Sequence, residues 1–338
     1  MIYNRVEFHN VSQVSTQEGL PGVGLHRIPE SLRPGLNDSA KDVGMCPSQT
    51  EIRFVTDAPA PKLTLYSGGH HEYAFVYCGD FLLSEHCIEP NQSLTIFMEM
   101  PTGLRELDPK KFERFPAHVW RVRLSGTRSV HFVELDTAGH EVRPPTPEEA
   151  PASRWVAYGS SITHGFSASR LANPWTQLAA TALRKDMLNL GFGGCCHAEN
   201  AMADYLAERD DWDLCTLELG INLISNPITD DEFRQRCAYM MDRVATAHPR
   251  AKVVVITPFL NRQHIVGKRA PKDLHSFDDF RDILRDEVFA RKHLTNLYLM
   301  EGRDVLDRAD GLSADLCHPS DFGQAVMADN FVRLFKAL

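Results

Sequence analysis

The first part of the chain alternates apolar and polar residues with a period of two. The alternation extends from about residue 51 to residue 135, as at Ile52 and Phe54 on either side of an arginine. Successive side chains of a β-strand point to opposite faces of its sheet, so this pattern indicates half-buried strands. Clusters of glycine, proline and asparagine separate the apolar runs and supply frequent turns. Short strands joined by frequent turns predict an antiparallel β-sandwich domain over residues 1–142.

A proline-rich segment follows. Residues 143–153 contain four prolines. Proline lacks a backbone N–H and has a fixed φ, so it interrupts both helices and sheet ladders and stiffens an exposed linker. We therefore predict a domain boundary here, with residues 143–153 linking the sandwich to a second domain over residues 154–338.

The second part has a different periodicity, because apolar strand-like runs alternate with amphipathic stretches. The runs are residues 155–158, 187–190, 214–219, 253–256 and 297–299. Strands that alternate with helices are typical of a parallel sheet, whose crossover helices lie on both faces. We predict a three-layer α/β/α domain.

The composition supports two domains and limits the partners. The chain has 338 residues, of which 43% are apolar, whereas single cores stop growing at about 250–300 residues. The formal net charge is −9 and no basic cluster is present, which argues against nucleic acid and anionic membranes as partners. The sequence also lacks a run of about 18 apolar residues that could span a membrane. We expect a small-molecule substrate, no nucleic-acid partner and no membrane partner.

The cysteines and the first residues bear on the cellular compartment. None of the eight cysteines has a partner at C-x-x-C spacing, so no structural zinc site is expected. Residues 1–10 lack the apolar stretch of a signal peptide. We therefore expect reduced thiols and a cytoplasmic protein.

Ligands of an open parallel sheet bind beyond the carboxyl ends of its strands. After the first run, Ser160 and Ser161 stand at the start of a helical region, where a serine either caps the helix or acts as a nucleophile. Residues 189–194 contain three glycines, which either form a tight turn or let a backbone N–H face a ligand. Asn222 follows the third run, as a turn residue or as a donor to an oxyanion.

The last of these positions holds a carboxylate and an imidazole. Asp315 and His318 are three residues apart, just before the final amphipathic stretch. The aspartate can hold one ring nitrogen while the other nitrogen faces a serine hydroxyl, which needs a base to become a good nucleophile. A D-x-x-H match alone is common in solvated loops, so this pair gains weight from the other three positions.

Together the blocks at residues 159–163, 189–194, 218–222 and 315–318 resemble the SGNH or GDSL family of serine hydrolases. The resemblance covers residues 154–338 and implies a flavodoxin-like α/β/α fold that needs no metal or other cofactor. It makes Ser161 the nucleophile, His318 the general base and Asp315 the residue that orients the base. The oxyanion hole would consist of the Ser161 and Gly194 N–H groups and the Asn222 side chain.

Two positions depart from the commonest form of this family. Ser160 stands where aspartate is commoner, and Ile221 where glycine is commoner in the third block. The first departure leaves the three reacting residues in place, whereas the second bears on the position of Asn222.

Residues 164–170 and the following Trp175 resemble the corresponding sequence of one branch of the family. Members of that branch carry a jelly-roll-like β-sandwich ahead of the hydrolase domain. That branch removes acetyl groups from sugars. The resemblance implies a serine esterase that deacetylates carbohydrates of the acetylxylan or xylo-oligosaccharide type through an acyl-enzyme. The alternatives are a lipid esterase or thioesterase of the same family, and a carbohydrate-binding protein without catalytic activity.

Several side chains near the ends of the predicted strands are candidates for substrate contacts. We expect Trp175, Phe192, Arg170 and Phe259 to bind substrate, with core packing as the alternative for the aromatic residues. Arg262, Gln263 and His264 follow the fourth run and are candidates for contacts with substrate hydroxyls. The basic stretch that ends at His275 is interpreted either as a mobile rim of the site or as a contact within a homo-oligomer.

One further pair is a candidate for metal binding. His70 and His71 follow two glycines. Adjacent residues of a strand point to opposite faces, so the two rings are not expected to share an ion. No metal is expected from this pair.

Overall fold

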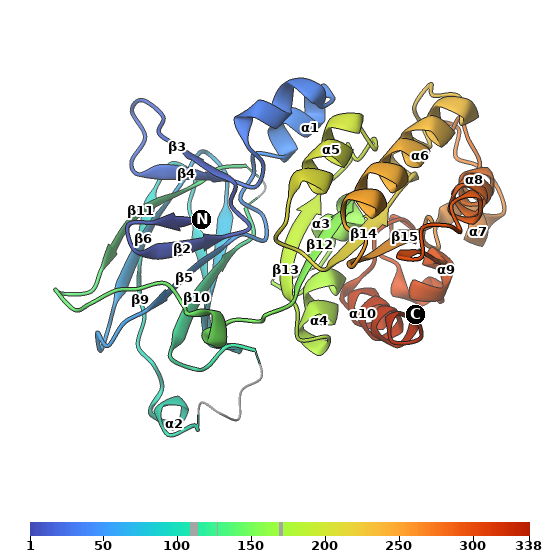
Figure 1. Cartoon of the computed structure of the whole chain (residues 1–338). Coiled ribbons are helices and arrows are strands. Elements are labelled where there is room, and N and C mark those ends of the chain that lie inside the picture. Colours follow the sequence, from blue (N-terminus) through green and yellow to red (C-terminus); the bar gives the residue numbers. More distant parts are fainter. Residues whose placement is uncertain (109–113, 127, 169–171) are drawn as a thin grey trace. The chain divides into compact units, whose positions relative to one another are not determined.

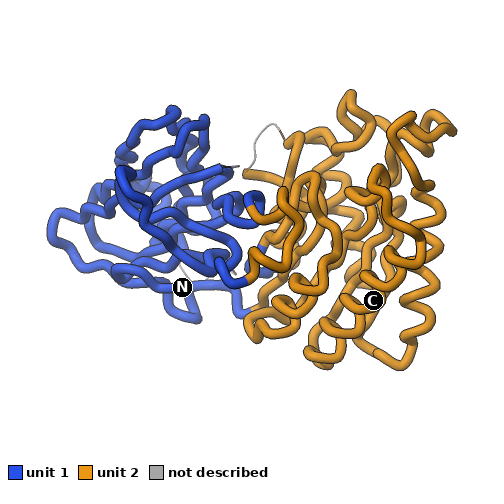
Figure 2. Tube along the Cα trace, turned by 90° about the horizontal axis from the view of Figure 1, so that it is seen from above, with its two compact units in different colours: residues 1–31, 42–152, 184–188 blue, residues 32–41, 153–183, 189–338 orange. Residues whose placement is uncertain are grey.

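The computed structural model describes residues 1–108, 114–126, 128–168 and 172–338. Arg170, expected to bind substrate, lies outside the described residues. The chain forms two compact units (Figure 2): unit 1 contains residues 1–31, 42–152 and 184–188, and unit 2 contains residues 32–41, 153–183 and 189–338. Segment 32–41, which precedes the expected boundary, belongs to unit 2 because Asn37 Nδ2 donates to Glu199 Oε1 and to Cys195 O.

Unit 1 consists of two antiparallel sheets (Figure 1). The first has the order β1 (Ile2–Tyr3), β2 (Val6–His9), β5 (Glu51–Val55), β10 (Val119–Leu124), β7 (Glu72–Cys78), β8 (Phe81–Ile88). The second has the order β3 (Gln13–Ser15), β4 (Val23–His26), β11 (Val130–Asp136), β6 (Lys62–Ser67), β9 (Ser93–Phe97). One apolar cluster draws residues from both sheets, including Phe8, Ile52, Phe54, Leu63 and Leu65. The predicted antiparallel sandwich is confirmed, and the alternating apolar positions form its core.

Four short helices lie in the first 152 residues. Helices η1 (Glu30–Gly35) and α1 (Asp38–Val43) lie mostly in segment 32–41 of unit 2, whereas α2 (Thr102–Arg105) and η3 (Pro147–Glu149) belong to unit 1. The last of these lies in the proline-rich segment. Thr146 and Glu149 form a capping box around it, and Glu149 also binds the Arg143 guanidinium. The segment is therefore held by local hydrogen bonds as well as by its prolines.

Unit 2 is built on a parallel sheet, except that residues 186–188 of one edge strand group with unit 1. Its strand order is β13 (Asp186–Gly191), β12 (Arg154–Gly159), β14 (Leu214–Glu218), β15 (Lys252–Ile256), β16 (Leu297–Met300). Its α-helices are α3 (Ser161–His164), α4 (Trp175–Ala182), α5 (Asn200–Glu208), α6 (Asp230–Ala247), α7 (Arg262–Val266), α8 (Phe277–Ala290), α9 (Gly302–Val305) and α10 (Asp321–Phe335). Helices α5 and α6 cover one face of the sheet, and α4 and α10 cover the other (Figure 1). The predicted three-layer α/β/α architecture is confirmed.

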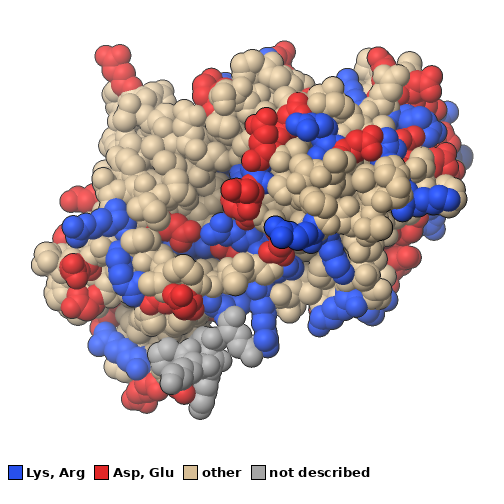
Figure 3. All heavy atoms as spheres, viewed as in Figure 1, with Lys and Arg blue, Asp and Glu red and all other residues tan. Residues whose placement is uncertain are grey.

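The surface carries charges of both signs. On the face drawn in Figure 3, lysine and arginine side chains are interspersed with aspartate and glutamate. Within the described parts of the chain, every helix is too short or too polar to cross a bilayer.

Candidate active site

The turn from β12 into α3 positions Ser161. Ser160 caps this helix, because its Oγ accepts a hydrogen bond from the Ile162 N–H, as the commoner aspartate could also do. A Cβ atom on Gly159 would lie 2.3 Å from Thr163 Oγ1 and 2.6 Å from Glu218 Oε2, so glycine permits this close turn. Ser161 therefore stands directly beyond the carboxyl end of a central strand, where ligands of parallel sheets bind.

Ser161, His318 and Asp315 form a continuous hydrogen-bonded chain. Ser161 Oγ lies 2.7 Å from His318 Nε2, and His318 Nδ1 lies 2.6 Å from Asp315 Oδ2. Asp315 Oδ1 also accepts from the backbone N–H groups of Cys317 and His318. Partial burial opposes ionisation of Asp315, but hydrogen bonds from the His318 ring and these N–H groups lower the pKa of its carboxyl. An ionised Asp315 can orient the imidazole so that His318 Nε2 faces the serine hydroxyl.

Backbone contacts hold the loop that carries the imidazole. Ser313 N–H donates to His318 O at 2.7 Å, and Leu312 pairs with Pro319 in an isolated antiparallel bridge. Arg262 N–H donates to Leu316 O at 2.8 Å and so ties α7 to the same loop. These bonds fix the position of His318 relative to the ends of the strands.

Asn222 and Gly194 line the same cavity as Ser161. Asn222 Oδ1 accepts from the Cys196 N–H at 3.1 Å, which leaves the amide NH₂ group available as a donor. Gly194 has φ of +78°, a left-handed conformation that favours glycine. Ile221 does not displace Asn222 from the site, since both residues line the cavity. The three expected oxyanion donors are therefore brought together around one space.

The cavity has a volume of about 570 Å³, within the usual range for small-ligand sites. Apolar side chains line part of it: Phe166, Ile221, Ile224, Phe277 and Leu316. Polar and charged residues line the rest, among them Ser225, Asn261, Arg262, Gln263, Lys272 and Asp273. All of these residues belong to unit 2. The cavity therefore presents both apolar surface and hydrogen-bonding groups beside Ser161.

The structure corrects the expected roles of three aromatic residues. Trp175, Phe192 and Phe259 are at most 1% exposed and do not line the cavity. Trp175 packs edge-on against Phe259, and its Nε1 donates to Ile162 O. All three side chains are therefore core residues, and Trp175 also supports α3 through its bond to Ile162.

Other residues of the cavity wall come from a loop that folds back over the site. Ile224 O accepts from the backbone N–H groups of Leu274 and His275, which brings the segment before α8 to the cavity. Phe277 then lines the cavity from the first turn of that helix, where nothing in the sequence distinguished it from an ordinary core residue. Of the candidates after β15, Arg262 and Gln263 line the cavity, whereas His264 interacts with Asp278 outside it.

Glu218 is a buried carboxyl behind the nucleophile that the sequence did not single out. Its Oε2 accepts from the Ser160 N–H at 2.6 Å and from Thr163 Oγ1 at 3.1 Å. Among the described residues, no group bonds its Oε1. Burial raises the pKa of Glu218 from 4.5 to about 7, although the hydrogen bonds from Ser160 and Thr163 oppose the shift. The end of β14 therefore carries a carboxyl that titrates near neutral pH.

This raised pKa predicts a pH-dependent effect of Glu218→Gln. The unfolded chain releases the proton near pH 4.5 and the folded chain near pH 7, so the stability that this group contributes is full below pH 4.5 and is lost as the pH rises through 7. Glutamine does not titrate. The free energy of unfolding of Glu218→Gln, relative to the unmodified protein, should therefore rise by about 2–3 kcal/mol between pH 5 and pH 8.5 in urea titrations.

Glu232→Gln is the matched control. Hydrogen bonds from Thr229 lower the pKa of this exposed carboxyl, so it is largely ionised in both the folded and the unfolded chain above pH 5. The stability of Glu232→Gln relative to the unmodified protein should therefore stay nearly constant between pH 5 and pH 8.5. A difference between Glu218→Gln and the unmodified protein that stays constant over this pH range would contradict the raised pKa.

Comparisons with known proteins agree with this architecture. The model of the GDSL-like lipase/acylhydrolase family matches residues 153–336. No curated protein sequence matches the chain. The structure is similar to a salicylyl-acyltransferase from a tetracycline biosynthetic pathway, with a TM-score of 0.81 and 17% identity over 99% of this chain and 95% of that one.

Two carbohydrate-active structures are also similar. A family two carbohydrate esterase from Clostridium thermocellum, in complex with cellohexaose, has a TM-score of 0.59 and 15% identity over 90% of this chain and 97% of that one. An acetyl xylan esterase from Butyrivibrio proteoclasticus has a TM-score of 0.60 and 11% identity over 100% of this chain and 96% of that one. At these identities the comparisons show a shared two-part fold.

Proposed function

Because the chain belongs to the GDSL-like lipase/acylhydrolase family, we propose that it is a serine esterase that removes O-acetyl groups from carbohydrates of the xylo-oligosaccharide type. The observation that carries this proposal is the hydrogen-bonded chain from Ser161 Oγ through His318 to Asp315, at the wall of a cavity of about 570 Å³. Nucleophile, base and orienting carboxylate are the parts that ester cleavage by a serine requires.

The first half of the reaction transfers the acetyl group to the enzyme. Ser161 Oγ attacks the acetyl carbonyl carbon while His318 Nε2 takes the hydroxyl proton, and Asp315 stabilises the imidazolium. The carbonyl oxygen becomes an oxyanion that accepts hydrogen bonds from the Ser161 and Gly194 N–H groups and from the Asn222 amide. The intermediate then collapses, the sugar oxygen leaves with the proton from His318, and an acetyl ester remains on Ser161.

The second half regenerates the enzyme. Water takes the place of the sugar hydroxyl, and His318 removes a proton from it as it attacks the acetyl carbon. The same donors stabilise the second oxyanion. Acetate then leaves, and Ser161 Oγ recovers its proton from His318.

The proposed substrate is supported by the lining of the cavity. Arg262, Gln263 and Ser225 offer donors and acceptors to sugar hydroxyls beside the reacting serine. Two similar structures are a carbohydrate esterase and an acetyl xylan esterase, which favours an acetylated sugar over a lipid ester.

A second candidate is the transfer or hydrolysis of a bulkier, aromatic acyl group. Phe166 and Phe277 line the cavity and can stack on an aromatic ring. The similar salicylyl-acyltransferase supports this candidate.

A substrate panel separates the two candidates. The purified protein is assayed for acetate released from acetylated xylo-oligosaccharides, and for cleavage of nitrophenyl acetate, benzoate and octanoate. Sugar deacetylation predicts acetate release and the highest kcat/KM for the acetyl ester. Rapid cleavage of the benzoate without acetate release from any sugar would favour the aromatic acyl group, and a preference for the octanoate would indicate a lipid esterase.

A further inference from the structure

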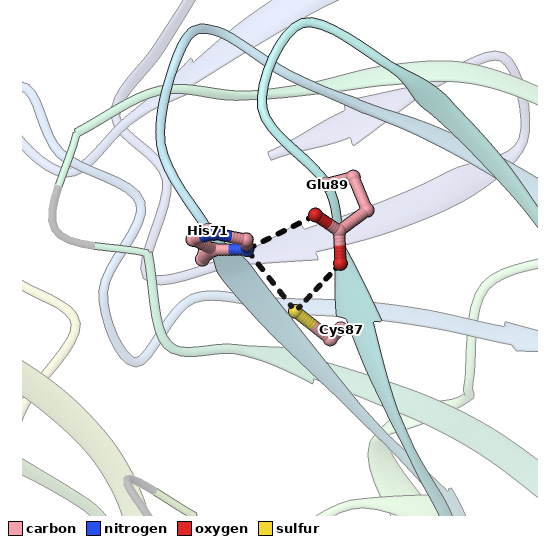
Figure 4. A group of neighbouring side chains, drawn as sticks. All are labelled: His71, Cys87 and Glu89. Atoms are coloured by element: carbon pink, nitrogen blue, oxygen red, sulfur yellow. Dashed lines mark hydrogen bonds and ion pairs between the residues drawn. The ribbon is translucent and has the colours of Figure 1, made fainter.

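A cluster of three metal-ligating side chains lies in unit 1, at the open end of the β7–β8 hairpin. His71 precedes β7, Cys87 lies near the end of β8, and Glu89 follows β8. Figure 4 shows the three side chains pointing toward one another. Strand β8 is at the edge of its sheet, so this cluster faces solvent.

The strand register explains why these residues meet. Tyr73 pairs with Cys87, and Glu72 pairs with Ile88, so the next step of the antiparallel register places His71 opposite Glu89. Cys87 and Glu89 are two residues apart and share one face of the strand. His70 is not part of this group of side chains, as expected for adjacent histidines. The partners of His71 come from the neighbouring strand, which the spacing of histidines alone could not reveal.

The distances between the donor atoms fit a tetrahedral zinc ion. His71 Nδ1 is 3.3 Å from a Glu89 carboxylate oxygen and 3.7 Å from Cys87 Sγ, and Cys87 Sγ is 4.0 Å from the other Glu89 oxygen. Zinc bonds of about 2.0–2.1 Å to nitrogen or oxygen and about 2.3 Å to sulfur place tetrahedral ligand atoms about 3.3–3.6 Å apart. The separations of His71 Nδ1 from its two partners are within a few tenths of an ångström of these values, and one ligand atom from each of the three residues lies within 4.8 Å of the others.

The chemistry of the donors selects the ion. An imidazole, a thiolate and a carboxylate together suit Zn²⁺, whereas Ca²⁺ and Mg²⁺ prefer oxygen ligands alone. Cys87 is the one exposed cysteine of the eight, and the His71 and Glu89 side chains are 60% and 56% exposed. A fourth ligand can therefore come from water.

We propose that His71, Cys87 and Glu89 bind one Zn²⁺ ion. The ion would link His71, before β7, to the end of the edge strand β8. The Cys87 thiol releases its proton to solvent as the Zn–S bond forms. Because the folded hairpin holds the ligands together, zinc binding stabilises unit 1. The site is independent of the proposed esterase site, whose residues all belong to unit 2.

The test is metal titration of the full chain with a chromophoric zinc chelator as competitor, together with Co²⁺ titration followed by absorption. We expect one bound zinc ion per chain, and a cobalt–thiolate charge-transfer band in the Co²⁺ titration. Cys87→Ala should abolish that band, and both Cys87→Ala and His71→Ala should weaken zinc binding at least tenfold. The adjacent His70→Ala is the matched control and should bind zinc as the unmodified protein does.

Thermal unfolding gives an independent readout. Zinc should raise the Tm of the unmodified protein and of His70→Ala, and should leave the Tm of Cys87→Ala unchanged. Zinc affinity that is equal in His71→Ala, Cys87→Ala and the unmodified protein would overturn the proposal, because the ion would then be bound elsewhere. Absence of binding at micromolar zinc would overturn it as well.

Discussion

Replacing Ser161 by alanine is expected to lower kcat for ester hydrolysis by about a millionfold. Ser161 is the hydroxyl within 2.7 Å of His318 Nε2, and alanine offers neither a nucleophile nor a proton for the imidazole to take. Ser161 is largely buried, at 7% exposure, and alanine is smaller, so the variant should fold normally. The measurement is the initial rate of acetate release, with circular dichroism to confirm folding.

Ser225→Ala is the matched control for this experiment. Ser225 lines the same cavity, but its Oγ bonds Asp273 instead of a catalytic group. Its loss should change KM for a sugar ester more than kcat. A Ser161→Ala protein that retains activity within tenfold of the unmodified enzyme would show that another group attacks the ester.

Glu51→Gln is expected to produce the largest loss of stability, about 3–5 kcal/mol in the free energy of unfolding. Glu51 is 3% exposed and accepts hydrogen bonds from the guanidinium groups of Arg53, Arg121 and Arg123. Burial opposes its ionisation, but these cations hold the pKa of Glu51 well below its usual range. Glutamine keeps the volume but removes the charge, which leaves buried guanidinium groups without their shared counter-ion.

Calorimetry of the full chain can test this effect and assign it to a unit, because two units can unfold in separate transitions. Asp310→Asn is the control, since Asp310 forms an exposed ion pair with Arg308 and such pairs add little to stability. If Glu51→Gln unfolds at the same temperature as the control, the buried network does not support unit 1.

The architecture of both units could be predicted because the spacing of apolar residues distinguishes strands from helices. It also shows that the two faces of an element differ in polarity. The alternation at Ile52 and Phe54 identified strands of the sandwich core. It did not reveal that Arg53, between them, is also buried, at 1% exposure. Periodicity shows that two faces differ in polarity, but it does not show what covers the polar face.

The candidate site could be predicted where its chemistry required particular residue types in order along the chain. Asp315 and His318 meet Ser161 as expected from the four sequence blocks. The walls of the cavity could not be predicted in the same way, because an aromatic residue near a strand end has the same local pattern whether it faces a ligand or the core. Trp175 is in the core and Phe277 lines the cavity for reasons of tertiary packing.

The role of Glu218 and the cluster of His71, Cys87 and Glu89 could not be predicted from the sequence, for a related reason. Glu218 ends an apolar strand, and its titration near neutral pH depends on burial beside Ser160. His71 meets Cys87 and Glu89 only through the register of two strands. Neither arrangement leaves a signal in residue spacing.

In the proposed reaction, an acetyl group passes from a sugar oxygen to Ser161 and then to water. Peptide mass spectrometry after acid quench of the enzyme mixed with an acetylated xylo-oligosaccharide tests it most directly. The proposed mechanism predicts an acetyl group on the Ser161 side chain during turnover, and none on the corresponding peptide of Ser161→Ala. Steady acetate release with no acetylated Ser161, or with the acetyl group on a different residue, would contradict it.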